Sequence, residues 1–375
     1  MKILYVTTIG TTMNFFKPLI KELVKEGNAV DIATNTDIAD VSDFYRDLNC
    51  NIYKISCIRT PFSFKNIRAV KEIKEIVKNK HYDIVHCHTP VASFSTRFAC
   101  RKIRKSGTKI IYTCHGFHFH KKSSFINWLI YYPAERMCSY FTDMIITINK
   151  EDYNIAKKFG AKKVKYIHGV GIDFNAISNM NVDISSFREK IGVPSNAFLL
   201  TSIGELSKRK NFGVVIDALH NIDNENIYYV ICGEGSQRVN LSEKIKHYGL
   251  DKRIILLGQK DHDYVLQLCH ASNVGVIPSL FEGLGLAGLE HMAAGKPVIG
   301  SNIHGIKDYI IDGETGLMCE PNNYIDYSKA IIRLMNNEED YRKMSINAKQ
   351  KAKEFDYKIS IEEMKNNYAE IESFR

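Results

Sequence analysis

The sequence lacks several features that define large classes of proteins. No apolar run in its 375 residues reaches the ~18 residues that a membrane-spanning helix needs. The nine cysteines form no C-x-x-C pair, which argues against a zinc site or a disulfide framework and favours buried thiols in a reducing compartment. The opening MKILYVTTIG is too short and too β-like for a signal peptide and is expected to form the first strand. A soluble globular protein of the cytoplasm is therefore predicted.

Complete phosphate-binding motifs are also missing where they are expected. No G-x-x-x-x-G-K-[ST] is present, and glycine loops follow three predicted strands, at Gly10-Thr11, Gly204 and Gly233-Glu234. None of these three loops completes G-x-G-x-x-G, the spacing that an NAD-dependent oxidoreductase needs together with an acid about twenty residues on. Because tight turns favour glycine whether or not they bind a ligand, the glycines of each loop alone are also consistent with a purely structural role.

Positive charge is concentrated in the first half of the chain. Residues 1–173 hold 28 Lys and Arg against 15 Asp and Glu, whereas the remainder holds 23 against 27. The first half is therefore expected to meet an anionic partner, either a nucleic acid, a membrane surface or a phosphorylated ligand. A nucleic acid is disfavoured because no basic–aromatic repeat or known binding motif accompanies the charge.

Short apolar runs alternate with helical patterns along the whole chain. The first half contains KILYVTT, AVDIATN, YDIVHCHT, KIIYTCHG and DMIITIN, and the second FLLTSIGEL, IYYVICGEG, RIILLGQ, VGVIPS and KPVIGS. This alternation predicts two doubly wound α/β domains at 1–175 and 195–355, with the polar segment 174–196 as their linker. Ligands of such sheets bind outside the carboxyl ends of the strands, so a cleft between the domains is the expected site.

Three cations follow the strand FLLTSIG. Lys208, Arg209 and Lys210 precede a predicted helix that Asn211 is placed to cap. Cations beside a helix amino terminus form an anion site, because both the amides and the side chains favour phosphate. The alternative is a solvated basic loop.

The stretch SLFEGLGLAGLEHMAAGKPVIGS places two acids eight residues apart. A helix from about Leu286 to Ala294 puts Glu282 in the preceding loop and Glu290 about one turn into the helix. A diphosphate would rest on the amides of residues 283–286, a sugar hydroxyl on Glu282 and ribose hydroxyls on Glu290. One small element would thus bind both ends of a nucleotide sugar.

Two other constellations could hold a metal ion. Asp261 and Asp263 form a D-x-D, but they open a helix, where acids complement the helix dipole. His86 and His88 flank Cys87 at a strand end without an accompanying set of acidic ligands. No metal site is therefore predicted.

Two segments of the basic half have amphipathic patterns. These are residues 65–80 and 124–141, the second of which carries Trp128, Tyr131 and Tyr132. Basic faces with interfacial aromatics suit peripheral contact with an anionic membrane, and the alternative is an ordinary solvated helix face.

The block PSLFEGLGLAGLEHMAAGKPVIGSNIHGIKDYIIDGETGLMCEPNN resembles the E-x7-E region of the retaining glycosyltransferases of family 4, which have the GT-B fold. The stretches IGEL…RKN, ICGEGS, ILLGQ and IHGVGID fall in that family's order, so the resemblance covers nearly the whole chain. YTCHGFHFH and VHCHTPVASF further resemble the subgroup that builds bacterial exopolysaccharide or capsule repeat units. The implied fold is two Rossmann-like domains facing a central cleft, with a C-terminal helix at 356–375 crossing back onto the first domain.

The resemblance implies roles on the donor side. Lys210 and Arg209 would hold the diphosphate, Glu290 the ribose and Glu282 the transferred sugar, while the backbone around Gln259–Lys260 would touch the base. The expected nucleotide-binding set also includes Gly204, Gly233, Glu234, Gly283, Leu284, Gly285 and Leu286.

On the acceptor side, the resemblance places His115 beside the reacting sugar. The Gly10 loop, with Thr11, and Phe117 would face the acceptor. One departure is Glu205, where many family members carry an arginine.

The predicted activity is a metal-free, cofactor-free retaining transfer of an N-acetylhexosamine or a hexose from a UDP-sugar. The acceptor is expected to be a polyprenyl-diphosphate-linked saccharide at the inner face of the membrane, in cell-surface polysaccharide synthesis. A UDP-sugar epimerase of the same fold is the principal alternative.

Overall fold

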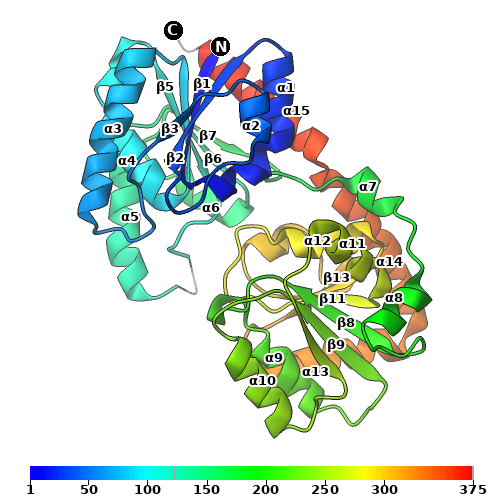
Figure 1. The fold of residues 1–375 in the computed structure, drawn as a ribbon. Helices are drawn as coiled ribbons and strands as arrows, with labels where there is room; N and C mark the ends of the chain where they lie inside the picture. Colours follow the sequence, from blue (N-terminus) through cyan, green and yellow to red (C-terminus); the bar gives the residue numbers. More distant parts are fainter. Residues whose placement is uncertain (121–122, 374–375) are drawn as a thin grey trace. The chain divides into compact units, whose positions relative to one another are not determined.

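The computed structural model describes residues 1–120 and 123–373, which divide into two compact units. The first unit contains Met1–Val170 and the segment that begins at Lys358, and the second contains Gly171–Tyr357. The chain thus leaves the first unit once and returns to it at its C-terminal helix (Figure 1). The two Rossmann-like sheets described below confirm the predicted GT-B fold class.

The first unit is built on a seven-stranded parallel sheet of order β3-β2-β1-β4-β5-β6-β7. Its strands are β1 (Lys2–Ile9), β2 (Ala29–Asn35), β3 (Ile52–Lys54), β4 (Ile84–His88), β5 (Lys109–Cys114), β6 (Met144–Thr147) and β7 (Lys163–Tyr166). The central strands are buried on both faces, which is why their sequences read as continuous apolar runs rather than alternating ones.

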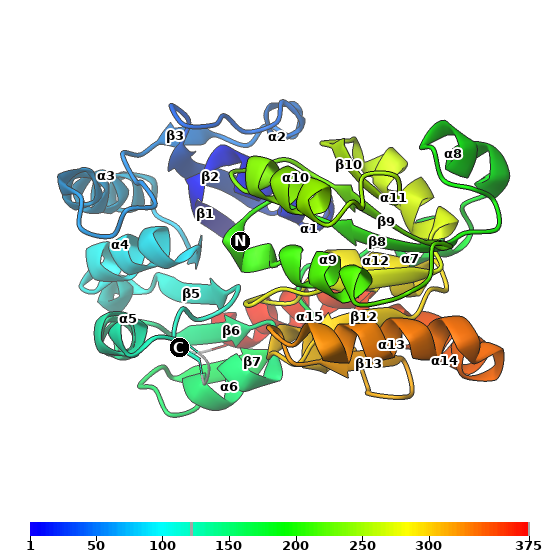
Figure 2. The same ribbon diagram turned by 90° about the horizontal axis from the view of Figure 1, so that it is seen from below.

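Helices cover both faces of this sheet. They are η1 (Gly10–Phe16), α1 (Lys17–Lys25), α2 (Phe44–Asp47), α3 (Phe64–Lys80), α4 (Pro90–Cys100), η2 (Ile103–Ser106), α5 (Phe125–Ser139), α6 (Lys150–Ala156) and α15 (Tyr357–Glu372). Both ribbon views show α3, α4 and α5 side by side on one face, with α1 and α15 on the other (Figures 1 and 2). Ala69, Ile73 and Val77 of α3 join the core beneath the first of these layers.

The second unit has a six-stranded parallel sheet of order β10-β9-β8-β11-β12-β13. Its strands are β8 (Phe198–Ile203), β9 (Ile227–Cys232), β10 (Ile254–Gly258), β11 (Val274–Ile277), β12 (Val298–Ser301) and β13 (Gly316–Cys319). Its helices are α7 (Phe174–Ser178), α8 (Ile184–Lys190), η3 (Lys208–Lys210), α9 (Gly213–His220), α10 (Arg238–His247), α11 (His262–Ala271), α12 (Leu286–Ala293), η4 (Gly305–Asp308), α13 (Tyr324–Asn336), α14 (Glu338–Ala352) and η5 (Lys353–Phe355). Separate apolar clusters lie on the two faces, one under α9, α10 and α13 and the other under α8 and α11.

The segment 174–196 differs from its predicted role as a linker. It contains α7 and α8 and belongs to the second unit. Phe187 and Ile191 are buried with residues of β8, β9 and α11, and the Arg188 guanidinium donates to the carbonyls of Ala197 and Ala271. The polar composition of this segment reflects one exposed helix face rather than an unpacked chain.

The C-terminal helix α15 packs on the first unit, as expected from the resemblance. Tyr368 is fully buried, and its hydroxyl lies 2.5 Å from that of Tyr5 and 2.7 Å from Nδ1 of His86. At the surface, Glu363 pairs with His168 and Lys365 with Glu26. Polar contacts therefore fix the register of the helix on β1 and β4.

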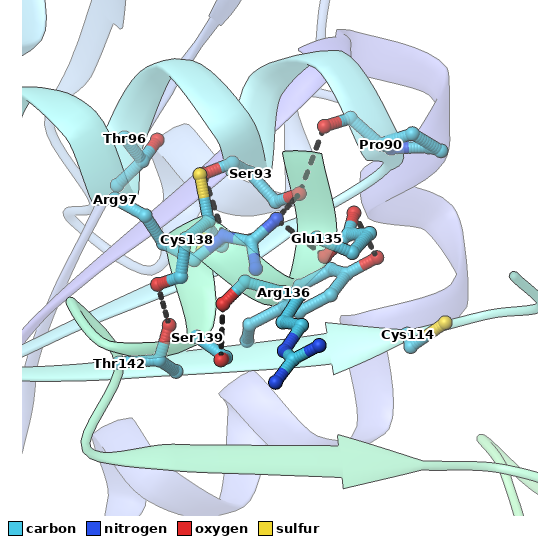
Figure 3. Close-up of polar contacts among 12 residues, drawn as sticks. Pro90, Ser93, Thr96, Arg97, Cys114, Glu135, Arg136, Cys138, Ser139 and Thr142 are labelled. Carbon is cyan, nitrogen blue, oxygen red and sulfur yellow. Dashed lines mark hydrogen bonds and ion pairs between the residues drawn. The ribbon is translucent and has the colours of Figure 1, made fainter. Parts of the chain in front are cut away.

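A buried ion pair joins α4 to α5. Arg97 is completely buried, and its Nη2 lies 2.8 Å from Oε2 of Glu135 (Figure 3). The guanidinium also stacks 4.2 Å over the Tyr112 ring and donates to the Ser93 carbonyl. Since neither charge is solvated, each depends on the other for compensation.

Removing one member of this pair should destabilise the first unit. Glu135→Leu leaves the Arg97 guanidinium buried without a counter-charge, which is expected to cost about 3–5 kcal/mol. The double variant Arg97→Met/Glu135→Leu should regain most of that loss. Urea unfolding of the two variants measures the difference, and equal stabilities would contradict a buried pair.

Candidate functional site

The carboxyl ends of β8 and β11 form the point where strand order reverses in the second unit. The loop after β8 carries Arg209 and Lys210, and the loop after β11 carries Ser279 and Glu282. The backbone joins the two loops, because the amide of Leu280 donates to the carbonyl of Arg209 over 2.8 Å. The residues expected to bind the donor's sugar and diphosphate thus share one edge of the sheet.

Glu282 is buried and bound from three directions. Its Oε1 lies 2.5 Å from Nζ of Lys210 and 3.0 Å from Nη1 of Arg209, and it accepts from Oγ of Ser279 over 3.0 Å. Burial alone would raise the pKa of Glu282, but the two cations and the hydroxyl outweigh it and lower that pKa. The carboxylate is therefore ionised and holds both cations in place.

Lys210 lies directly over Gly204. A side chain at this position would place its Cβ 2.8 Å from Cε of Lys210, and Gly204 has a φ of +143°. The backbone conformation thus favours glycine, and a Cβ would in addition crowd the Lys210 side chain. Asn211 does not have its predicted capping role. Helix α9 begins at Gly213, and the side-chain Nδ2 of Asn211 donates to the carbonyl of Pro321.

Helix α12 begins and ends close to its predicted limits. Gly285 precedes it with a φ of +90°, so the chain turns sharply before the first helical amide. Glu290 is buried on this helix, and its Oε1 lies 2.9 Å from Nε2 of His262. Leu284 is buried, whereas Gly283, Gly285 and Leu286 of the same turn are partly exposed.

The spacing G-x-G-x-x-G, which the loops after β1, β8 and β9 do not complete, occurs at 283–288 in the loop that opens α12. Gly288 is required because a Cβ there would lie 2.3 Å from the hydroxyl of Tyr309. The chain therefore does contain the glycine spacing of a dinucleotide-binding enzyme, and what excludes that class of enzyme is the membership of another family.

The predicted base-contacting residues lie at the neighbouring strand ends of the same sheet edge. Gln259 and Lys260 follow β10 and are exposed, with the Lys260 ammonium 5.2 Å from the Tyr264 ring centroid. Glu234, after Gly233, pairs with Arg238 over 2.7 Å. These residues lie at the same edge of the sheet as Glu282.

Residues of the D-x-D at 261–263 cap helix α11 and contact Glu290 on α12. Asp261 caps α11 by accepting from the amide of Tyr264, and His262 reaches Glu290. Within residues 1–120 and 123–373, no group of three His, Cys, Asp or Glu side chains is arranged to hold a metal ion. A role for His262 was not predicted from the sequence, although this residue is the middle position of the D-x-D.

In the first unit, the equivalent edge is lined by aromatic and imidazole rings. His115 follows β5 and is partly buried, and its Nε2 lies 3.2 Å from Nδ1 of the fully buried His88. Burial lowers the pKa of His115 to about 4 and that of His86 to about 3. Both rings are therefore neutral at physiological pH.

Two residues of the predicted acceptor side lie near this edge and one does not. Gly10 is buried against the carbonyl of Ala39, to which its amide donates, and Thr11 is exposed in η1. Phe117 differs from its prediction: its ring is buried in the core and stacks 4.8 Å from that of Phe119. Phe117 lies three positions after the end of β5, and the sequence pattern does not show whether a side chain there points into the core or toward the edge of the sheet.

Glu205 is exposed in the loop after β8. Within the part of the chain that the structure describes, it forms no ion pair with Arg209 or Lys210, whose partner is Glu282. The acid at this position therefore does not neutralise them.

Comparison with known proteins places this architecture in a family. Residues 183–351 match the model of the glycosyl transferases group 1, and residues 15–173 match that of glycosyltransferase family 4. The chain is 32% identical over 377 residues to the putative glycosyltransferase EpsD of Bacillus subtilis, covering 98% of this chain and 96% of that protein. It is 29% identical to the UDP-Gal:alpha-D-GlcNAc-diphosphoundecaprenol alpha-1,3-galactosyltransferase of Escherichia coli over 73% of each chain.

Solved structures agree in fold. The Anabaena protein Alr3699/HepE, crystallised with UDP and glucose, aligns with a TM-score of 0.81 at 20% identity, over 99% of this chain and all of that one. A lipopolysaccharide glycosyltransferase, WaaG, aligns with a TM-score of 0.73 at 16% identity, over 94% and 95% of the two chains. The protein is a glycosyltransferase with the GT-B fold. It belongs to glycosyltransferase family 4, as its sequence motifs predicted.

The pair formed by Glu290 and His262 predicts a measurable titration. The hydrogen bond to Glu290 raises the pKa of His262, against the smaller opposing effect of burial. A raised folded-state pKa means that the stabilisation is fully present below about pH 6.5 and is lost as pH rises through the folded-state value. Glu290→Gln should therefore lower the His262 pKa, measured by NMR titration of its ring protons. Glu243→Gln, on exposed α10, is the control; a shift common to both variants, or absent from both, would contradict the pairing.

Proposed function

We propose that this enzyme transfers a sugar from a UDP-sugar to a lipid-linked saccharide, with retention of configuration at the anomeric carbon. The observation that carries the proposal is the cluster of Lys210, Arg209 and Glu282 beside the start of α12. The names of relatives add support: the E. coli galactosyltransferase uses a diphosphoundecaprenol-linked acceptor, and HepE was crystallised with UDP and with UDP-glucose. Cell-surface polysaccharide synthesis is the proposed setting.

Two cations and the amino terminus of α12 form the proposed binding site for the diphosphate. Lys210 and Arg209 neutralise its charge, while amides at 283–286 donate to its oxygens at the positive end of α12. Glu290 accepts from the ribose hydroxyls, and His262 beside it keeps that carboxylate oriented. Gly204, Gly233 and Glu234 together with Gln259–Lys260 border the nucleoside.

Transfer then breaks the bond between the anomeric carbon and the UDP oxygen and forms a bond to an acceptor hydroxyl oxygen. The cations stabilise the negative charge that develops on UDP, which preorganised charge does most effectively in a water-excluded site. The departing phosphate oxygen takes the acceptor's proton. Glu282 binds a hydroxyl of the transferred sugar, an N-acetylhexosamine or a hexose, and no covalent sugar–enzyme bond is formed.

We further propose that the first unit contacts an anionic membrane through the starts of α3 and α5. Trp128, Tyr131 and Tyr132, expected at the interface, instead pack partly buried against the core. The exposed apolar residues are others: Phe62 85%, Phe64 88%, Phe125 79%, Ile126 65% and Leu129 65% exposed. Exposed lysines and arginines follow Phe64 along α3, which suits lipid of negative charge. No described helix is long and apolar enough to cross a bilayer.

Selective stabilisation by UDP tests the donor proposal. Thermal unfolding with UDP, GDP, ADP and NAD, each with and without EDTA, should show a shift for UDP that EDTA does not change. A ligand at ~100 times its dissociation constant adds about 2.7 kcal/mol of stability. A shift for GDP alone would contradict the UDP donor, and loss of the shift with EDTA would contradict metal-free binding. Product analysis separates the epimerase alternative, which needs no acceptor.

Flotation with vesicles tests the membrane proposal. Binding to vesicles of mixed phosphatidylglycerol and phosphatidylcholine should exceed binding to phosphatidylcholine alone. Phe125→Ser/Ile126→Ser should reduce it several-fold, because it removes the inserted apolar side chains. Ile346→Ser, which changes an equally exposed side chain on α14 of the second unit, should have no effect. Equal loss in both variants, or no loss in either, would contradict the assigned surface.

A further inference from the structure

His88 occupies a fixed position at the end of β4. Its ring is fully buried between other rings, with centroids 4.3 Å from Phe16 and 4.2 Å from His86, and it lies nearly parallel to Tyr5 at 5.4 Å. This packing prevents the ring from turning away. The direction of its two nitrogens is therefore set by the fold.

The two nitrogens of His88 have different environments. Nδ1 lies 3.2 Å from Nε2 of His115, whereas Nε2 is buried and has no hydrogen-bond partner within the described part of the chain. His86 beneath it is saturated: its nitrogens lie 2.7 Å from the hydroxyls of Tyr368 and Thr113. Of the two β4 histidines, only His88 is directed at His115.

This asymmetry determines where the His88 proton lies. Burial, with the neighbouring His86 and His115, lowers the pKa of His88 well below its usual value, so the ring is neutral and carries one N–H. A proton on Nε2 would be a buried donor without an acceptor, at a cost of about 1–3 kcal/mol. Orphaned buried N–H groups are rarer than under-satisfied acceptors. The proton therefore resides on Nδ1 and is donated to His115.

The tautomer of His115 follows from that bond. Its Nε2 accepts from His88, so in the neutral ring the single proton lies on Nδ1. The His115 ring has no other hydrogen bond among the described residues, and the residue is only partly buried. The Nδ1–H group is thus an available donor at the carboxyl edge of the sheet.

We propose that His88 is a positioning residue that holds His115 as its Nδ1–H tautomer, so that His115 donates a hydrogen bond to a substrate hydroxyl or a sugar oxygen. The catalytic consequence rests on the proposed glycosyl transfer, whereas the tautomer does not. His115 acts in this account as a hydrogen-bond donor rather than a general base. The analogous arrangement elsewhere is a metal-bound or catalytic imidazole whose tautomer is set by the bond that its other nitrogen makes.

The tautomer can be measured without substrate. In nitrogen-15-labelled full-length protein, long-range NMR correlations should show a protonated Nδ1 and an unprotonated Nε2 for His115, with its signals assigned by their loss in His115→Asn. His88→Phe keeps the ring stack but removes the donor, and should abolish the preference for Nδ1–H. His88→Asn places an amide N–H near the original Nδ1 and should restore it. A protonated Nε2 in the unmodified protein, or an unchanged tautomer in His88→Phe, would overturn the proposal.

Kinetics test the functional part separately. His88→Phe should lower kcat at least tenfold with little change in KM for the UDP-sugar, and His88→Asn should recover most of the loss. UDP-induced thermal stabilisation should stay unchanged in both variants, because the proposed UDP-binding residues lie in the other unit. A rise in KM without a fall in kcat would contradict positioning. Absence of UDP binding in the unmodified protein would refute the proposed donor while leaving the NMR result decisive for His88.

Discussion

The burial of the Glu282 carboxylate between two cations is the interaction on which the second unit's site depends. A buried acid needs compensation, and Lys210 and Arg209 supply it from a different loop. The pairing holds the loop after β8 against the loop after β11. These ion pairs therefore lie where the strand order reverses, which is the place where α/β sheets commonly bind ligands. Glycine at position 204 suits this arrangement, because its φ is +143° and a Cβ there would crowd the Lys210 side chain.

The two units present different chemistry at the carboxyl edges of their sheets. In the second unit the edge carries ionised groups held in pairs, suited to a charged diphosphate. In the first it carries neutral rings, with His86 and His115 deprotonated because burial disfavours their charged forms. Under the proposed function, the sheet of the second unit would neutralise the diphosphate charge and that of the first would form neutral hydrogen bonds to the sugar.

The fold could be predicted from the sequence because parallel strands that are buried on both faces leave continuous apolar runs. Helix α12 and the positions of Glu282 and Glu290 followed from glycines at both ends of one apolar stretch. The segment 174–196 was placed wrongly as a linker because a helix with one buried face and a polar surface resembles a linker in composition.

Side-chain direction was the part that the sequence could not provide. Phe117 and Trp128 pack in or against the core, whereas Phe125, which lies between them in the sequence, is exposed. His88 and His115 lie 27 positions apart, at the ends of β4 and β5, so no local sequence spacing predicts their contact. Such pairs depend on strand order, which becomes visible only in the folded chain.

Glu282→Gln tests the central claim most directly, because the amide keeps the shape of the side chain and removes the charge that organises the two cations. Transfer from a UDP-sugar and binding of UDP should be measured together in this variant, with Glu243→Gln as the control. The account predicts that UDP still binds, since Lys210 and Arg209 remain, while sugar transfer falls by at least a hundredfold. Transfer at the rate of the unmodified enzyme would contradict the assigned role of Glu282.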